Sequence, residues 1–420
     1  MDNIKNYLND LKTLISFKSE KGKKEPAAPF GKECRYAINF IKSLAEKFGF
    51  TTIDYDGYCL EVDFGEGEEI GIMGHLDVVP AGDGWESEPY TLTEKDGVYF
   101  GRGILDDKSP MLSCLYCLKE LKESGIKVNK KFRMFFGTNE ESGWEDVEYL
   151  KTKTTLPKYG FSPDGNFPVS YAEKGMCIVN FYLPKLKNFS KVKGGTVVNA
   201  VCGYATAQGI IDEGLLLKHG LTVSKDGKIE SVGKSAHGSR PELGINAIKK
   251  LFAYFIDCGE NLEKEYEYLF GDGFSFSKMI NEQGDVTFSP DIICEDETGI
   301  KITCDLRFPA PITLEEVLKK LEASGLKYTY SLKHGTQFVE KDGFLVDTLI
   351  NAYNAVTGES AKPIAQSGST FARVFEKGVA FGPEFPDKPS TIHEPNERAS
   401  IEEIEKTYDI YKKAIFDLAK

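Results

Sequence analysis

The chain alternates helical patterns with short runs of strand length, and this alternation constrains its fold more than any other feature. Apolar residues recur at helical spacing in residues 1–18 and again in 32–48. The runs 58–64, 69–75 and 131–138 instead predict strands, the first two separated by a glycine-rich turn. Helices that alternate with apolar strands are typical of an α/β layered domain.

The middle of the chain, residues 175–340, has a different character. Short strands such as 300–307 are mixed there with helices such as 241–258. After residue 340 the helix and strand pattern of the first part resumes. We therefore expect one α/β domain formed by 1–174 and 341–420, with an α+β domain inserted into it.

Composition excludes several classes of protein. The 420 residues carry a net charge of −13, which disfavours a nucleic-acid partner or an anionic membrane surface. No apolar run approaches the roughly 18 residues of a membrane-spanning helix. The first five residues lack the apolar stretch of a signal peptide, and the nine scattered cysteines are typical of reduced thiols. We therefore expect a cytoplasmic protein with no membrane or nucleic-acid partner.

The chain has only five histidines, and two of them stand among acidic residues near predicted strand ends or turns. His75 ends the predicted strand 69–75, and Asp77 follows two positions later. Ligands of open α/β sheets bind at the carboxyl ends of the strands. Further polar candidates follow strands or tight loops: Asp106, Asp107, Glu140, Glu141, Asp164 and His393.

Each of these residues has an ordinary explanation when taken alone, as a hydrogen-bonded histidine or a solvated acid. As a set they predict more, because burying several unpaired charges at strand ends is costly and a cation offsets that cost. Two histidines with three or four carboxylates suit two divalent ions bridged by one carboxylate and a water. An acid that is not a ligand would then serve as general base.

Six motifs, in order and spacing, resemble the co-catalytic dizinc peptidases, a family that includes aminoacylase, carboxypeptidase G and carnosinase-like dipeptidases. They are GHLDVVPAGDGW, GRGILDDKSP, GTNEESGW, SPDGNFPV, GKSAHGSRPELGINA and FGPEFP…IHEPNE. The resemblance runs from about residue 28 to the C-terminus and is greatest to the bacterial dipeptidase (PepV) branch. It implies a mixed-sheet α/β catalytic domain with an inserted α+β lid, and metal-dependent hydrolysis of short unblocked peptides, above all dipeptides.

The resemblance also implies site residues. His75, Asp106 and Asp164 would hold one metal, and Asp106, Glu141 and His393 the other, so that Asp106 bridges them. Glu140 would be the general base, Asp77 would orient His75, and His237 of the lid would stabilise the oxyanion. One position departs from the family pattern, because Ser109 stands where the family usually has glycine.

Substrate contacts would come from two further places: Asn199 and Arg307 in the lid, and the loop that contains Ser369, Thr370 and Arg373. A structural ion pair is the alternative for Arg307 and for Arg373, and a turn is the alternative for Asn199.

The implied cofactor is two divalent ions, zinc in first place, with manganese and cobalt as alternatives. The partner would be a small peptide substrate, and the long lid resembles a built-in substitute for a dimer partner, so we expect a monomer. Three other interpretations stay open: an N-acyl amino acid deacylase, a peptide-binding scaffold without catalysis, and a centre that holds a single metal.

Overall fold

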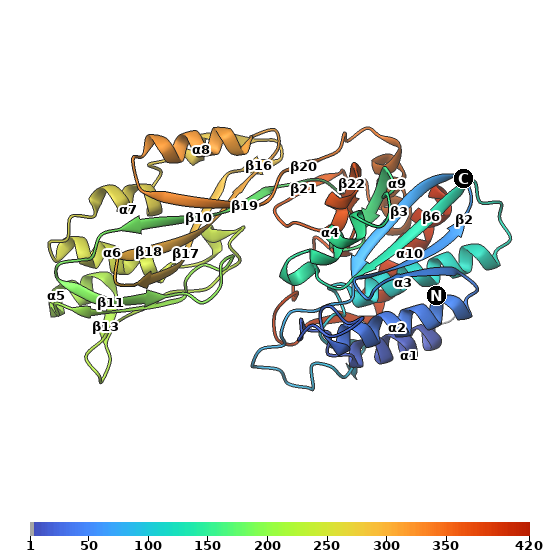
Figure 1. Cartoon of the computed structure of the whole chain (residues 1–420), viewed down its shortest axis with the longest axis horizontal. Helices are drawn as coiled ribbons and strands as arrows, with labels where there is room; N and C mark the ends of the chain where they lie inside the picture. The colour runs from blue at the N-terminus through green and yellow to red at the C-terminus, as the bar shows by residue number, and fades with distance from the viewer. Residues whose placement is uncertain (1–3) are drawn as a thin grey trace. The chain divides into compact units, whose positions relative to one another are not determined.

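The computed structural model describes residues 4–420, which form two compact units (Figure 1). The first unit comprises Met1–Tyr171 and Phe338–Lys420, and the second comprises Ala172–Gln337. Both boundaries lie three residues before the positions expected from the sequence, 174 and 340. Residues 1–3, on which the signal-peptide expectation partly depends, lie outside the described residues. No helix in the described part of the chain is long and apolar enough to cross a membrane.

The first unit is built on a nine-stranded mixed sheet. Its first six strands lie in the order β1 (Thr51–Tyr55), β2 (Cys59–Gly65), β6 (Lys130–Gly137), β3 (Glu68–His75), β7 (Tyr159–Ser162) and β22 (Lys377–Ala380). The neighbours from β6 to β22 run parallel, whereas β1 and β2 are antiparallel. The carboxyl ends of four strands therefore lie at one edge. The other three strands are β9 (Ser170–Glu173), β20 (Gln337–Phe338) and β21 (Ile364–Gln366).

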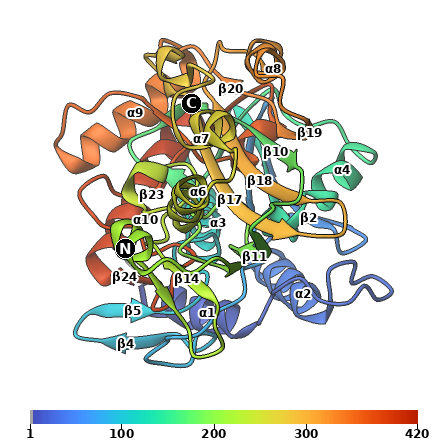
Figure 2. The same cartoon turned by 90° about the vertical axis from the view of Figure 1, so that its left-hand side faces the viewer.

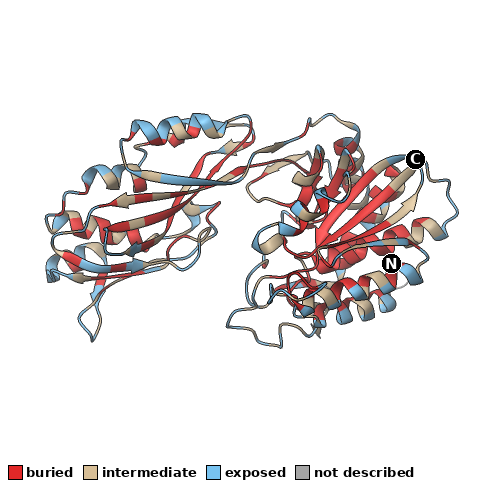
Figure 3. Ribbon diagram, viewed as in Figure 1, coloured by how far each residue is buried: buried red, intermediate tan, exposed pale blue. Residues whose placement is uncertain are grey.

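Helices cover both faces of the parallel strands. Helix α3 (Lys108–Glu123) lies on one face, where Met111 packs against Gly74 so closely that a side chain would not fit. On the other face, helix α4 (Glu145–Lys151) and the 3₁₀ helix η4 (Phe371–Val374) pack on Met73 and Phe135. Figure 3 shows β3 and β6 as the buried centre of this unit. The other helices are α1 (Ile4–Ser16), α2 (Lys32–Lys47), α9 (Phe344–Thr357) and α10 (Ile401–Leu418).

Two small sheets connect distant segments of the first unit. Strands β4 (Thr93–Lys95), β5 (Val98–Phe100) and β24 (Arg398–Ser400) form one of them (Figure 2). Strands β8 (Gly165–Asn166) and β23 (Pro383–Glu384) form the other. The first pairing places the loop after β5 beside the segment that precedes α10, although almost 300 residues separate them.

The second unit is an antiparallel sheet of eight strands with helices on one face. The strand order is β13 (Leu221–Val223), β14 (Ile229–Val232), β12 (Tyr204–Gly209), β11 (Phe189–Gly194), β17 (Thr287–Glu295), β18 (Ile300–Phe308), β10 (Gly175–Leu183) and β19 (Tyr328–His334). The helices are α5 (Glu213–His219), α6 (Ala247–Asp257), α7 (Glu263–Phe270) and α8 (Leu314–Ala323). Alternate residues of β10 and β18 enter the core that they form with these helices.

Two local features can be compared with the expectations from the sequence. The helix predicted over 241–258 is wrong at its start, because α6 begins only at Ala247. The Asn246 side chain caps it, and a 3₁₀ turn at Pro241–Leu243 precedes that cap. All nine cysteines are unpaired, and seven of them are buried.

Candidate metal centre

Three neighbouring parallel strands deliver polar side chains to one edge of the first sheet. His75 is the last residue of β3, and Glu140 and Glu141 lie in the 3₁₀ helix η1 (Glu140–Ser142) that follows β6. Asp164 comes two residues after the end of β7. The register, which pairs His75 with Gly137, brings these segments to the same level. The convergence expected at the carboxyl ends of parallel strands is therefore present.

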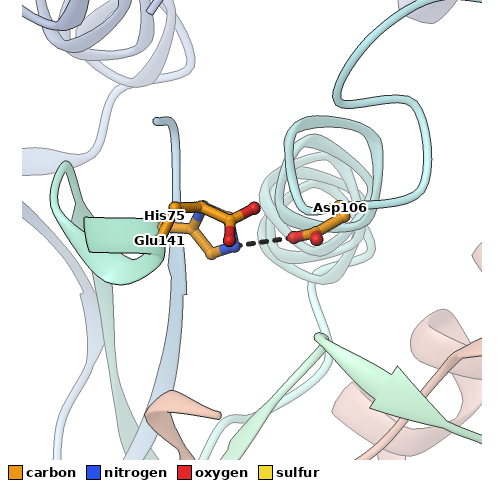
Figure 4. Close-up of side chains that lie close together, drawn as sticks. All are labelled: His75, Asp106 and Glu141. Carbon is orange, nitrogen blue, oxygen red and sulfur yellow. Dashed lines mark ion pairs between the residues drawn. The ribbon is translucent and has the colours of Figure 1, made fainter. Parts of the chain in front are cut away.

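The two carboxylate oxygens of Asp106 face two different histidines. Oδ1 lies 2.8 Å from His75 Nε2, and Oδ2 lies 2.8 Å from His393 Nε2. A second carboxylate accompanies each histidine: Asp164 Oδ2 is 3.7 Å from His75 Nε2, and Glu141 Oε1 is 2.9 Å from His393 Nε2. Figure 4 shows His75 and Glu141 on one side of Asp106, which precedes helix α3. The candidate centre thus consists of two groups of side chains, each with one histidine and one further carboxylate, and both groups include Asp106.

With a neutral His75 ring, the contact between His75 and Asp106 suits a bound cation. His75 Nδ1 lies 2.9 Å from the carbonyl oxygen of Asp77, which can only accept, so in a neutral ring the proton is on Nδ1. The lone pair of Nε2 then points at Asp106 Oδ1. Both atoms are buried and neither has a hydrogen-bond partner among the described residues. Ligand atoms of His75, Asp106 and Glu141 lie within 4.8 Å of one another, and imidazole with carboxylates suits a divalent transition metal.

The electrostatics of the acids indicate uncompensated negative charge. Burial raises the pKa of Glu140 well above its usual value, and the nearby carboxylates of Asp164 and Glu141 add to the rise. Burial likewise raises the pKa of Glu141, with Asp106 adding and His393 opposing. A bound dication would reverse this trend, because it stabilises ionised ligands.

The pKa values of the two histidines are raised as well, by their carboxylate neighbours. Burial lowers the pKa of His75, but the carboxylates of Asp106 and Asp77 outweigh burial and hold it well above its usual value. Burial would raise the pKa of Asp106, yet His393 and His75 hold it well below its usual value. The side chain of His75 is fully buried whereas that of His393 is 42% exposed, so the centre is open to solvent beside His393.

Asp77 connects the first histidine to the loop of the two glutamates. Its Oδ1 accepts a hydrogen bond from the backbone N–H of Glu140 at 3.1 Å, and its Oδ2 accepts one from Glu141 at 3.2 Å. Oδ1 also lies 3.4 Å from His75 Nδ1. This buried carboxylate can therefore orient both segments at once.

Sequence reasoning missed Glu397, which organises the loop that carries Asp106. Its fully buried carboxylate accepts hydrogen bonds from the backbone N–H groups of Gly103, Leu105 and Asp106 at 3.0, 2.8 and 3.3 Å. The guanidinium of Arg102 donates a fourth at 2.8 Å. The available signal was that Glu397 is the acid that closes the motif containing His393.

The start of α3 packs tightly against the end of β3 through Asp107. Asp107 Oδ2 accepts a hydrogen bond from the backbone N–H of His75 at 3.2 Å, and a Cβ at Gly74 would lie only 1.9 Å from that oxygen. Ser109 lies in the first turn of α3 and outside the positive-φ region, so serine fits there without strain. Its hydroxyl lies 2.7 Å from the hydroxyl of Tyr7.

The loop predicted to contact substrate lies beside His75. Thr370 caps η4 by accepting a hydrogen bond from the Ala372 N–H, and the ring of Phe371 meets His75 edge-on at 6.2 Å. The Ser369 hydroxyl oxygen is buried without a hydrogen-bond partner among the described residues. Arg373 follows in η4 itself.

His237, Asn199 and Arg307 belong to the second unit and gather there. The N–H of Gly238 donates to the carbonyl of Asn199 at 2.6 Å, which links the His237 turn to the Asn199 loop. Arg307 is bound by Asp305 at 2.9 Å, and a Cβ at Gly238 would lie 2.7 Å from the same carboxylate. Two of the three alternatives raised from the sequence describe features that are present: Arg307 forms an ion pair, and Asn199 lies in a turn with a φ of +87°.

Comparisons with known proteins agree on one family. The model of peptidase family M20/M25/M40 matches residues 71–417. A Staphylococcus epidermidis protein named "Putative dipeptidase" is 30% identical over 453 residues, which cover 98% of this chain and 96% of that protein. A Staphylococcus aureus protein of the same description is 29% identical with the same coverage.

Solved structures show the same fold at low identity. Human carnosine dipeptidase 1 superimposes with a TM-score of 0.63 and 16% identity, covering 99% of this chain and 96% of that one. A dinuclear metal-binding M20 peptidase of Bacillus subtilis gives a TM-score of 0.51 and 10% identity, covering 98% and 99%.

Proposed function

Because the chain belongs to peptidase family M20/M25/M40 and is therefore a hydrolase of peptide bonds, we propose that it is a dimetal dipeptidase acting on unblocked dipeptides. One observation carries the proposal: the two oxygens of Asp106 face two separate groups of ligands. The names of the staphylococcal relatives support the substrate class.

The two metal positions follow from the two groups. His75 and Asp164 would hold one ion with Asp106 Oδ1, and Glu141 and His393 would hold the other with Oδ2. Zinc is the first choice for this ligand set, with manganese and cobalt as alternatives. When bound, such ions acidify a water and polarise the peptide carbonyl.

Glu140 is the general base of this proposal. It takes a proton from the attacking water and passes it to the leaving amine. Two contacts support the assignment: its neighbour Glu141 faces His393, and the Asp77 carboxylate fixes the backbone of Glu140. The Glu140 carboxyl also interacts electrostatically with Asp164 and Asp106, so it would lie beside the ions without being needed as a ligand.

The remaining candidates bind the substrate. His237 donates a hydrogen bond to the oxyanion, and Asn199 and Arg307 contact the substrate from the lid. Ser369, Thr370 and Arg373 provide a further contact in the first unit, supported by the packing of Phe371 on His75. The enzyme is a cytoplasmic monomer in this proposal, and the eight strands contributed by one chain to the second unit support a lid that needs no partner.

The test is hydrolysis of a panel of dipeptides and their N-acetylated counterparts, with manganese or zinc supplied and with a chelated control. We expect metal-dependent cleavage of the free-amino dipeptides only. Cleavage of only the acetylated compounds would instead indicate an N-acyl amino acid deacylase. If neither set is cleaved by protein that holds two ions, the dipeptidase proposal is wrong.

A further inference from the structure

The imidazole of His237 has a defined partner on one of its two nitrogens. The backbone N–H of Ser239 donates a hydrogen bond to Nδ1 at 3.2 Å, and the hydroxyl oxygen of Ser239 lies 2.7 Å from the same atom. His237 is exposed, whereas Ser239 beside it is only 8% exposed. Ser239 therefore places both its backbone amide and its hydroxyl against Nδ1 of His237.

These contacts determine which nitrogen carries the proton. A backbone amide can donate but cannot accept, so Nδ1 must offer its lone pair to Ser239. The hydroxyl, which can rotate, then donates to the same nitrogen. A neutral imidazole has a single N–H, and that N–H is consequently on Nε2.

The backbone on both sides of the ring is also fixed within the second unit. The N–H of Arg240 closes a turn on the carbonyl of His237 at 2.9 Å. Ala200 pairs with His237 in an isolated β-bridge, and the Gly238 N–H is bound to Asn199. The backbone of the His237 turn is thus held by contacts within the second unit, two of which come from the distant segment 199–200.

We propose that Ser239 is a positioning residue that holds His237 in the tautomer protonated on Nε2. The inference rests on the proposed role of His237 toward the oxyanion. A developing oxyanion is stabilised by a donor already in place, whereas a bare Nε2 lone pair would repel it. Ser239 touches neither the substrate nor the reacting atoms in this proposal and acts only through the ring.

Nitrogen-15 NMR tests the tautomer directly. The chain has five histidines, so long-range correlations between ring protons and ring nitrogens give a simple spectrum. The His237→Ala variant identifies the signals of His237 by their disappearance. Above the pH at which the ring is neutral, we expect the shift pattern of a proton on Nε2. A pattern with the proton on Nδ1 would overturn the proposal.

Two variants of Ser239 separate positioning from mere packing. Ser239→Ala keeps the amide and removes the hydroxyl, and Ser239→Thr is the matched control that keeps both groups. We expect Ser239→Ala to lower kcat roughly 3- to 10-fold, about the factor that one neutral hydrogen bond contributes, with KM nearly unchanged. Because the Ser239 amide remains in Ser239→Ala, we expect the nitrogen shifts of His237 to move only partway toward the other tautomer there and to stay in place in Ser239→Thr.

The outcomes distinguish this inference from the proposed function. If Ser239→Ala leaves both kcat and the nitrogen shifts as in the wild type, Ser239 does not position the ring. If His237→Ala keeps full kcat, the oxyanion role is wrong and the catalytic half of the inference falls with it. The NMR result on the wild-type protein decides the tautomer in either case.

Discussion

Glu397 Oε1 accepts a hydrogen bond from the backbone N–H of Asp106, the residue whose side chain faces both histidines of the centre. Because Glu397 lies four residues after His393, the segment that contains one proposed ligand also holds the loop that contains the proposed shared ligand. Four hydrogen bonds converge on this carboxylate. Partners of this kind commonly contribute 10- to 100-fold to metal affinity.

Replacing Glu397 by glutamine should therefore weaken metal binding by roughly 10- to 100-fold. The amide keeps the size of the side chain but offers one acceptor oxygen instead of two and leaves Arg102 without its counter-charge. Competition titration with a chelating dye, using manganese or zinc, measures the affinity. Glu403→Gln is the matched control, because the Glu403 carboxylate accepts hydrogen bonds from the backbone N–H and the hydroxyl of Ser400 at the start of α10. Equal affinities in the two variants would contradict the role of Glu397.

The Asp106→Asn variant should lose metal from both positions, since one carboxylate serves both groups. An amide nitrogen would replace one of the two oxygens that face His75 and His393. Elemental analysis after gel filtration gives the number of ions per chain, and the circular-dichroism spectrum controls for folding. Retention of two ions would point to Asp107 as the shared ligand.

Glu140→Gln should lower kcat by about 10²- to 10⁴-fold and leave the metal content unchanged. The amide occupies the same space but cannot take a proton from the attacking water. Steady-state kinetics on an unblocked dipeptide, with the ions counted in the same preparation, is the measurement. A kcat close to that of the wild type would exclude Glu140 as the base.

The stability of the second unit should depend on pH through Asp291. Burial raises the pKa of this carboxyl to about 7, although the Ser289 hydroxyl and the Asn199 N–H stabilise its ionised form. Between its unfolded value of 3.8 and about 7, the unfolded chain binds fewer protons than the folded one. The free energy of unfolding therefore falls as the pH rises through this window.

Asp291→Asn removes this dependence. From pH 5 to pH 8 the wild type should lose roughly 2 to 3 kcal/mol of unfolding free energy that Asp291→Asn keeps. Urea unfolding of both proteins at both pH values measures this difference. The control is Asp296→Asn in the same unit, because Asp296 is exposed and its pKa is lowered by Thr298. If the free energy of unfolding depends on pH in the same way in Asp291→Asn and the wild type, the pKa of Asp291 is not raised in the folded protein.

The metal centre was largely predictable from the sequence because its residues follow elements with strong local signals. His75 closes an apolar run, and the two glutamates open the turn after another, so the rule for parallel strands brings them together. Asp106 needed the comparison of whole motifs, since a loop with two adjacent acids does not reveal which of them faces the histidines.

Contacts between distant segments were not predictable in the same way. Glu397 is 291 residues from Asp106, and only the pairing of β24 with β5 brings the two loops together. The start of α6 was misjudged because the apolar spacing continues through Leu243 and Ile245, while the Asn246 side chain caps the helix one residue before Ala247. The spacing of apolar residues predicts that a helix is amphipathic, but it does not predict the residue at which the helix begins. That residue depends on the side chain at the cap, here Asn246.

The first unit is made of two stretches of chain with the entire second unit between them. During synthesis, residues 172–337 leave the ribosome before His393 and Glu397 do, and domains generally fold as units while the chain emerges. The growing chain therefore carries His75, Asp106, Glu141 and Asp164 long before His393, the remaining residue of the candidate centre, exists. The proposed dimetal hydrolysis would therefore become available only after His393 has been synthesised.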